Sequence, residues 1–220
     1  YPGHHGHRAM KDPEARTNTV VRETLDRIGR DHPARDQLFQ AIEKDVLEIA
    51  AFLESHPILS MTGHDNLTII GTPPFLRGIY SVAGLNAAPP LEPSLKSLYY
   101  VTPIPKEWPD AKAEAKLREY NRYKLLLLSL HEALPGHYTQ LEYANRVQPE
   151  WRRVLRSAYG NNAYIEGWAQ YAEEVMLAQG FHDGGDPGMA LTFRKEQLRV
   201  LANAVLDVRL HTRGMTDTQA

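Results

Sequence analysis

The sequence predicts a mainly α-helical protein with one small β-sheet, and three observations lead to this fold class. Apolar residues recur at helical spacing through residues 13–55. Residues 57–109 are rich in proline and glycine and contain short β-prone runs. Helical patterns return at residue 111 and continue with few interruptions to the end. We therefore interpret residues 13–220 as one helical unit with a β insertion, and not as two separate domains.

The first helices are expected at residues 13–30 and 34–55. In the second, apolar side chains repeat at four-residue spacing, which places Leu38, Ile42, Val46 and Ala50 on one face. Both helices are predicted to pack on a core. Residues 1–12 precede them and combine three histidines with glycine and proline, so this segment is predicted to be flexible.

The β insertion contains three runs with β propensity, at residues 67–70, 78–82 and 98–102. They predict a small sheet joined by long loops. Two interpretations stay open: a structural β-meander, or an edge strand at 67–70 that pairs with an extended peptide.

The longest predicted helix covers residues 111–146, and its apolar stretch at 125–130 is expected to be buried nearly all round. Further helices are predicted at residues 150–158, 162–179 and 190–212. These helices carry every residue to which we assign chemistry below.

Composition excludes several classes of function. A formal net charge of −2 gives no basic surface for nucleic acid. The longest apolar run, residues 125–128, is far too short to span a bilayer. There is no cysteine, so any transition metal must be held by histidines and carboxylates. No targeting segment is recognisable, and the compartment is left open.

Both ends of the sequence suggest part of a longer polypeptide. The chain starts at Tyr1 without a methionine, and residues 216–219 have the pattern of a cap and first turn of another helix. We therefore expect a domain that is incomplete at both ends, with other segments of the same polypeptide packing on this chain.

The first candidate site is the stretch HEALPGH, which begins at His131 and ends at His137. Two zinc-binding histidines on one helix are usually four residues apart, with a glutamate beside them as the base. Six residues on a regular helix would turn the two rings about 240° apart. Pro135 breaks the helical hydrogen bonding and Gly136 tolerates the distorted backbone, so a bulge there could bring His137 round.

A second candidate group follows in residues 162–179, where Glu166, Gln170 and Glu173 share one helix face. Glu166 could complete a His₂Glu zinc site, and Glu173 could hold a ligand imidazole from behind. An amphipathic helix with a solvated acidic face explains this pattern equally well.

A third candidate group is near the C-terminus, where Asp207 and His211 are four residues apart and can pair. A protonated His211 could stabilise an oxyanion, and Arg209 could anchor a substrate carboxylate. An ordinary surface Asp–His pair is the alternative.

The segments HEALPGHYTQ, EGWAQYAEE and DVRLHTRGMT, in this order, resemble a bacterial domain-of-unknown-function family placed among the gluzincin-like zinc metallopeptidases. The resemblance covers roughly residues 35–220, and members of that family are generally longer. It implies a mostly helical peptidase-like fold with a metal site. Carried across residue by residue, it implies His131, His137 and Glu166 as metal ligands and Glu132 as the base.

The expected activity is hydrolysis of a peptide substrate by a Zn²⁺-activated water, with Glu132 as general base. His211 is the first candidate for the oxyanion donor, and Tyr164 or Tyr171 the next. Three alternatives remain: a metallohydrolase acting on non-peptide amides, a non-catalytic metal-binding domain, and a metal-free helical interaction module.

Overall fold

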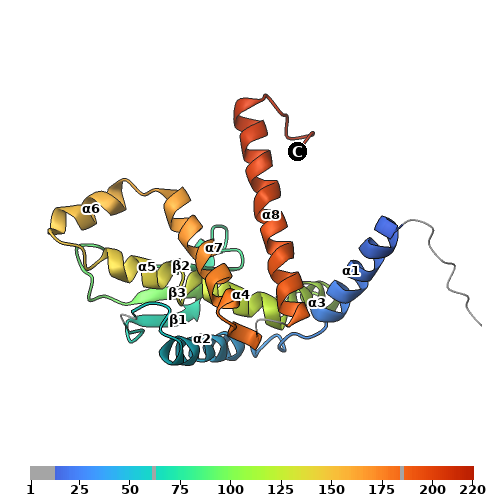
Figure 1. The fold of residues 1–220 in the computed structure, drawn as a ribbon, viewed down its shortest axis with the longest axis horizontal. Helices are drawn as coiled ribbons and strands as arrows, with labels where there is room; N and C mark the ends of the chain where they lie inside the picture. The colour runs from blue at the N-terminus through green and yellow to red at the C-terminus, as the bar shows by residue number, and fades with distance from the viewer. Residues whose placement is uncertain (1–12, 61–62, 184–185) are drawn as a thin grey trace, which may run out of the picture.

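The computed structural model describes residues 13–60, 63–183 and 186–220. It is mostly helical and contains one three-stranded sheet, as predicted (Figure 1). The predicted flexible segment 1–12 lies outside the described residues.

The N-terminal helices form where the apolar spacing predicts them. They are α1 (Pro13–Gly29) and α2 (Leu38–Ser55), and α2 starts four residues later than expected. The inner face of α2 is largely apolar, with Leu38, Ile42, Val46, Ile49, Ala50 and Leu53 buried. This face packs on the central helix of the molecule and thereby fixes that helix from below in the view of Figure 1.

The sheet consists of β1 (Leu67–Gly71), β2 (Ala83–Asn86) and β3 (Ser97–Val101), in the order β1-β3-β2. Strand β3 runs parallel to β1 and antiparallel to β2. The β-meander interpretation is therefore wrong, since a meander pairs consecutive strands antiparallel. Both β1 and β2 are edge strands, and β2 is the one that contacts the central helix.

The strand predicted at residues 78–82 is also wrong, because this segment continues a turn. A short 3₁₀ helix, η1 (Pro74–Leu76), precedes it. The N–H groups of Ile79 and Tyr80 both donate to the carbonyl of Leu76, at 2.9 and 2.8 Å. With these groups tied to the preceding turn, pairing with β3 begins only at Ala83.

The segment predicted as one helix over residues 111–146 is three helices. They are α3 (Asp110–Glu119), α4 (Arg122–Glu132) and α5 (His137–Ala144). The first break has a capping signal, since the side-chain oxygen of Asn121 accepts the N–H of Lys124 at 3.1 Å. The second break lies inside the HEALPGH stretch and is described with the site.

The remaining helices follow the predicted pattern. They are α6 (Glu150–Ala158), α7 (Asn162–Ala178) and α8 (Pro187–Thr212), with a short 3₁₀ helix, η2 (Phe181–Asp183), before α8. Helix α8 begins three residues earlier than expected, because Asp186 caps it by accepting the N–H of Gly188 at 2.8 Å.

Helix α4 lies at the centre of the core. Four of its leucines, Leu125, Leu126, Leu127 and Leu130, are at most 2% exposed, which confirms the prediction for this apolar stretch. The helix packs against α2, α7 and α8. Its C-terminal end is consequently held on several sides, and that end carries His131 and Glu132.

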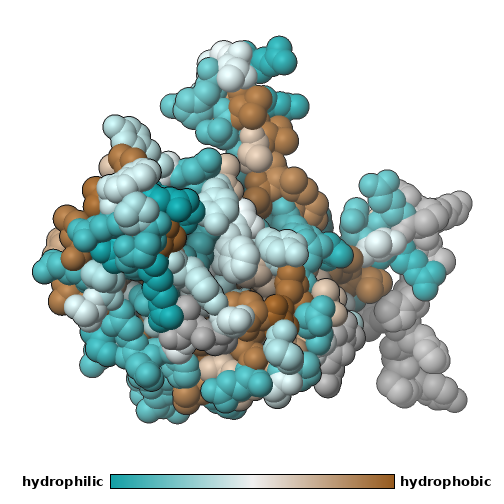
Figure 2. Space-filling view, turned by 60° about the vertical axis from the view of Figure 1, so that its left-hand side comes forward, coloured by the Kyte–Doolittle hydropathy of each residue, from teal (hydrophilic) through white to brown (hydrophobic). Residues whose placement is uncertain are grey.

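Helix α8 leaves the body of the protein and projects from it (Figure 1). Its projecting part carries exposed apolar side chains, visible as a hydrophobic strip in Figure 2: Leu198, Leu201, Val205 and Val208. Contiguous apolar surface of this kind is typical of an interface. That other segments of the polypeptide pack here stays a prediction.

Among the described residues, no helix combines the length and the hydropathy that a membrane span requires.

Asp45 on α2 provides a prediction about stability. Its burial, and secondly the nearby Glu48 carboxylate, raise the pKa of Asp45 from 3.8 to about 7. Between these two pH values the folded protein keeps a proton that the unfolded chain has lost, so stability falls as pH rises. Asparagine at this position has no proton to lose, so Asp45→Asn removes this loss of folding stability at high pH. It should stabilise the protein on the order of 2–4 kcal/mol at pH 8, with little effect at pH 4. Urea unfolding at the two pH values measures it, and an equal effect at both would contradict it.

Candidate metal centre

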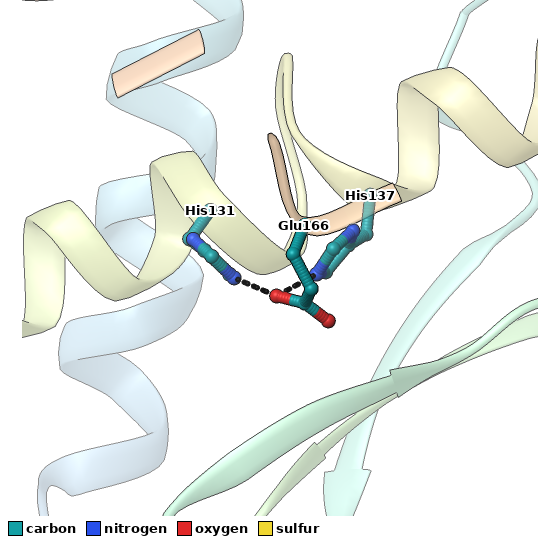
Figure 3. A group of neighbouring side chains, drawn as sticks. All are labelled: His131, His137 and Glu166. Carbon is teal, nitrogen blue, oxygen red and sulfur yellow. Dashed lines mark ion pairs between the residues drawn. The ribbon is translucent and has the colours of Figure 1, made fainter. Parts of the chain in front are cut away.

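Three side chains from different helices converge at the C-terminal end of α4. His131 lies in the last turn of α4, His137 begins α5, and Glu166 lies in the second turn of α7. Both imidazoles direct Nε2 at the same carboxylate oxygen, Oε2 of Glu166, at 3.4 Å for His131 and 3.6 Å for His137 (Figure 3). The three ligand atoms all lie within 4.8 Å of one another. The structure thus brings together the three residues predicted as ligands.

The spacing of these atoms fits a metal better than direct hydrogen bonds. Ligands at about 2.0–2.1 Å from a tetrahedral zinc ion are roughly 3.3–3.4 Å apart. The two N···O distances, 3.4 and 3.6 Å, are close to this value and beyond the usual hydrogen-bond range. Two histidines and one glutamate are also a donor set of catalytic zinc, which keeps a position open for water. Glu166 is 62% exposed, so solvent reaches the centre.

The position of His137 depends on a complete break between α4 and α5. The helix stops at Glu132, and His137 starts a new one after a tight turn. This turn replaces the predicted bulge and has the predicted effect: the two imidazole rings lie 4.7 Å apart, centroid to centroid, at 86°. Gly136 makes the turn possible, since a Cβ there would come within 1.8 Å of the His131 carbonyl oxygen.

Trp168 on α7 holds this turn, a role that its position in the sequence does not reveal. Its indole N–H donates to the carbonyl of Pro135 at 2.9 Å and to that of Gly136 at 3.2 Å. Trp168 is two residues after Glu166, so one helix carries both the third predicted ligand and the indole that holds the turn before His137. The only available signal was the tryptophan within the EGWAQYAEE segment, whose long-range partner the spacing does not reveal.

Glu173 orients His131 from behind, as the helix spacing predicted. Its carboxylate is 4% exposed and accepts the Nδ1–H of His131 at 2.8 Å. The proton on Nδ1 leaves Nε2 free for a metal. The side-chain amide of Gln170 donates to the same carboxylate oxygen of Glu173 at 3.3 Å. Gln170 thus helps to hold the carboxylate that orients His131.

Replacing Glu173 with Gln is expected to weaken zinc binding about 10–100-fold, the usual effect of losing such an outer carboxylate. Titration with zinc in competition with a chelator measures the change. The matched control is Glu174→Gln, which removes an exposed carboxylate from the next position of α7. Equal zinc affinity in the two variants would contradict the orienting role.

The charges around the histidines favour a cation. Burial opposes a proton on His131, but its contact with the Glu166 carboxylate and its hydrogen bond to Glu173 outweigh burial and raise its pKa to about 9. The two imidazoles in turn hold the pKa of the Glu166 carboxyl well below its usual range, chiefly through their close contacts with its carboxylate. A positive charge is therefore stabilised at this point of the structure.

Glu132 lies beside the three ligands. Burial raises its pKa, while the nearby His131 and His137 act in the opposite sense. A backbone hydrogen bond from Leu85 on β2 reaches its carboxylate. A hollow of about 110 Å³ adjoins Glu132 and His131, bordered on the far side by Glu196 and Val200 of α8. A half-buried carboxylate next to the ligands has the environment that a general base requires.

The structure does not bring the predicted C-terminal group to this centre. Asp207 and His211 do form the expected pair, with 3.2 Å between carboxylate and imidazole, but both side chains are more than 70% exposed. His211 is eleven residues beyond Val200, which places it about 16 Å further along α8. Arg209 is exposed on the same projecting part. In the described chain Asp207 and His211 therefore form an ordinary surface pair, which was the alternative to a catalytic role. His211 is not positioned as an oxyanion donor.

Tyr164 and Tyr171 both belong to α7 and are 59% exposed. On a helix they are turned about 160° and 140° away from Glu166, so neither phenol shares its face. Tyr171 lies next to Trp168, with 6.3 Å between ring centroids. Tyr164 lines a large pocket beside the centre. The catalytic role predicted for Tyr171 therefore has no geometric support.

The sequence was compared with protein families and with solved structures. The family model for “Bacterial protein of unknown function (DUF885)” matches residues 4–220. The structure of “a putative lipoprotein of unknown function from Shewanella oneidensis” is 33% identical, with a TM-score of 0.79, over 96% of this chain and 36% of that one. None of the curated proteins compared with the chain matches it.

A second solved structure, “the putative lipoprotein from Colwellia psychrerythraea”, is 21% identical with a TM-score of 0.69, which shows a shared fold. It is matched over 93% of this chain and 36% of its own length. The chain therefore spans 36% of each of these two structures. Because the family model covers nearly all of the sequence, the chain belongs to the bacterial DUF885 family of unknown function.

Proposed function

We propose that this chain carries the catalytic zinc site of a gluzincin-like peptidase. The observation that carries the proposal is the convergence of His131 Nε2, His137 Nε2 and Glu166 Oε2 at spacings that suit one zinc ion. Glu132 beside them supplies the base that such an enzyme needs. A purely structural zinc site would be closed by four protein ligands, whereas three ligands around an exposed carboxylate leave room for water and substrate.

The chain's own residues account for the proton transfers. His131, His137 and Glu166 would hold a zinc ion, which would supply a water of lowered pKa and polarise the substrate carbonyl. Glu132 accepts the proton of the attacking water on a carboxylate oxygen and then delivers it to the leaving amine. Glu173 keeps the His131 proton on Nδ1 throughout, so that the ring presents a constant tautomer.

The substrate backbone is proposed to lie along β2. The edge strand expected at residues 67–70 is indeed an edge, but β1 faces α2 and not the metal centre. Strand β2 forms the opposite edge and contacts α4, and Leu85 reaches Glu132 from it. An extended peptide that adds to this edge would bring its carbonyls past the three ligands.

The proposal is tested with the full-length protein, because the chain spans only 36% of the solved relatives. Cleavage of a peptide library is measured by mass spectrometry before chelation, after chelation, and after zinc is restored. We expect hydrolysis that chelator removes and zinc restores. Zinc-free protein whose activity chelator leaves unchanged would overturn the proposal. Bound zinc with hydrolysis of amides but not of peptides would assign the same site to another class of substrate.

A further inference from the structure

A large pocket lies next to the metal centre and is not used by the mechanism above. It has a volume of about 740 Å³, within the range of pockets that bind ligands. Its walls come from the end of β2 and the segment after it (86–90), from α5, from α6 and the residues that follow it, and from the start of α7. Gln140, one turn after His137, and Ile165, directly before Glu166, belong to its lining. The pocket therefore shares two of its walls with the helices that carry the ligands.

The ionisable lining of this pocket is positive. Arg153 and Arg156 of α6 contribute to it, and no aspartate or glutamate does. Arg156 is exposed and makes no hydrogen bond or ion pair with any part of the chain that the structure describes. Arg153 donates one Nη to the carbonyl of Asn145 at 3.0 Å, and its other Nη lies 3.5 Å from the exposed carboxylate of Glu150. Its buried Nε has no hydrogen-bond partner among the described residues. Two guanidinium groups that lack a full set of acceptors favour an anionic ligand.

Gln140 adds a hydrogen-bond acceptor to this pocket, whereas the two arginines are donors. Its side chain is 8% exposed, and its amide nitrogen donates to the backbone carbonyl of Tyr164 at 3.3 Å. This hydrogen bond fixes the orientation of the amide, so Oε1 is the free acceptor. Oε1 is buried and has no hydrogen-bond partner within the described ranges. A buried acceptor of this kind is costly unless a ligand or water donates to it.

We propose that this pocket binds a carboxylate of the peptide substrate. Arg153 and Arg156 hold the carboxylate, and Oε1 of Gln140 accepts an N–H of the neighbouring peptide unit. The inference rests on the proposed peptidase function and specifies its substrate: a peptide with an anionic group on the side of the scissile bond that faces α6. That group is the C-terminal carboxylate or an acidic side chain, and the experiment separates the two.

Binding is measured without turnover, using full-length Glu132→Gln protein and N-terminally fluorescein-labelled random hexapeptides. Three pools are compared by fluorescence anisotropy. The first has a free C-terminal carboxylate and no acidic residue. The second differs only in a C-terminal amide. The third has the amide and one glutamate. We expect the first or the third pool to bind at least about tenfold more tightly than the second, as a charged hydrogen bond to guanidinium implies.

Arg156→Gln, made in the same background, should remove most of that preference. The matched control is Arg152→Gln, which removes the same charge from α6 outside the pocket lining. Equal binding of the three pools, undetectable binding of all of them, or equal effects of the two arginine variants would overturn the proposal. A failure of the peptidase function is seen separately. In that case zinc-loaded wild-type protein cleaves no peptide although the carboxylate preference persists.

Discussion

Glu132→Gln is expected to reduce kcat by about 10²–10⁴-fold while zinc binding stays as in the wild type. The amide keeps the shape of the side chain but cannot accept the proton of the attacking water. The three ligands come from other residues, so the metal should be retained. Single-turnover peptide cleavage and zinc content, measured on the same preparation of full-length protein, test the two halves of this expectation.

A matched control for this variant is Glu119→Gln, which removes an exposed carboxylate paired with Lys116 on α3. It should leave both kcat and zinc content unchanged. If Glu132→Gln cleaves as fast as Glu119→Gln, Glu132 is not the base.

Gly136→Ala is expected to abolish zinc binding and to destabilise the protein by about 2–4 kcal/mol. A Cβ at this position would lie 1.8 Å from the carbonyl oxygen of His131 and 2.4 Å from that of Leu130. Both obstacles are backbone atoms, so the clash can be relieved only by moving the turn. Any such movement carries His137 away from His131 and breaks the contacts that Trp168 makes with the turn.

Gly167→Ala provides the control, because this glycine adjoins Glu166 in α7 and a Cβ there meets nothing within 4 Å. Alanine in a helix interior should stabilise the protein by about 0.5–1 kcal/mol and leave zinc binding intact. Thermal unfolding and zinc titration of the two variants give the comparison. Wild-type zinc affinity in Gly136→Ala would show that the turn does not position His137.

The sequence predicted local features of the site well. The i, i+4, i+7 spacing placed Glu166, Gln170 and Glu173 on one face, and all three lie at the centre. The Pro-Gly pair predicted a distortion of the backbone before His137, and the structure has one there, although as a complete break between α4 and α5 and not as a bulge within one helix. These features depend on helix periodicity and on backbone constraints of single residues, which a sequence displays directly.

Features that depend on long-range packing were not predictable. Asp207 and His211 pair as their spacing requires, but only the packing of the first half of α8 on the body sets the direction in which they project. Likewise, β2 begins at Ala83 because the preceding residues stay tied to η1. The hydrogen bond from Trp168 joins α7 to the turn between α4 and α5, and the spacing of residues within α7 does not indicate it.

The proposed metal ligands are tested most directly by anomalous diffraction at the zinc edge from crystals of the full-length protein grown with zinc. We expect one anomalous peak at about 2.0–2.2 Å from Nε2 of His131, Nε2 of His137 and Oε2 of Glu166. A zinc ion bound elsewhere, or no peak at these three atoms in zinc-saturated protein, would contradict it.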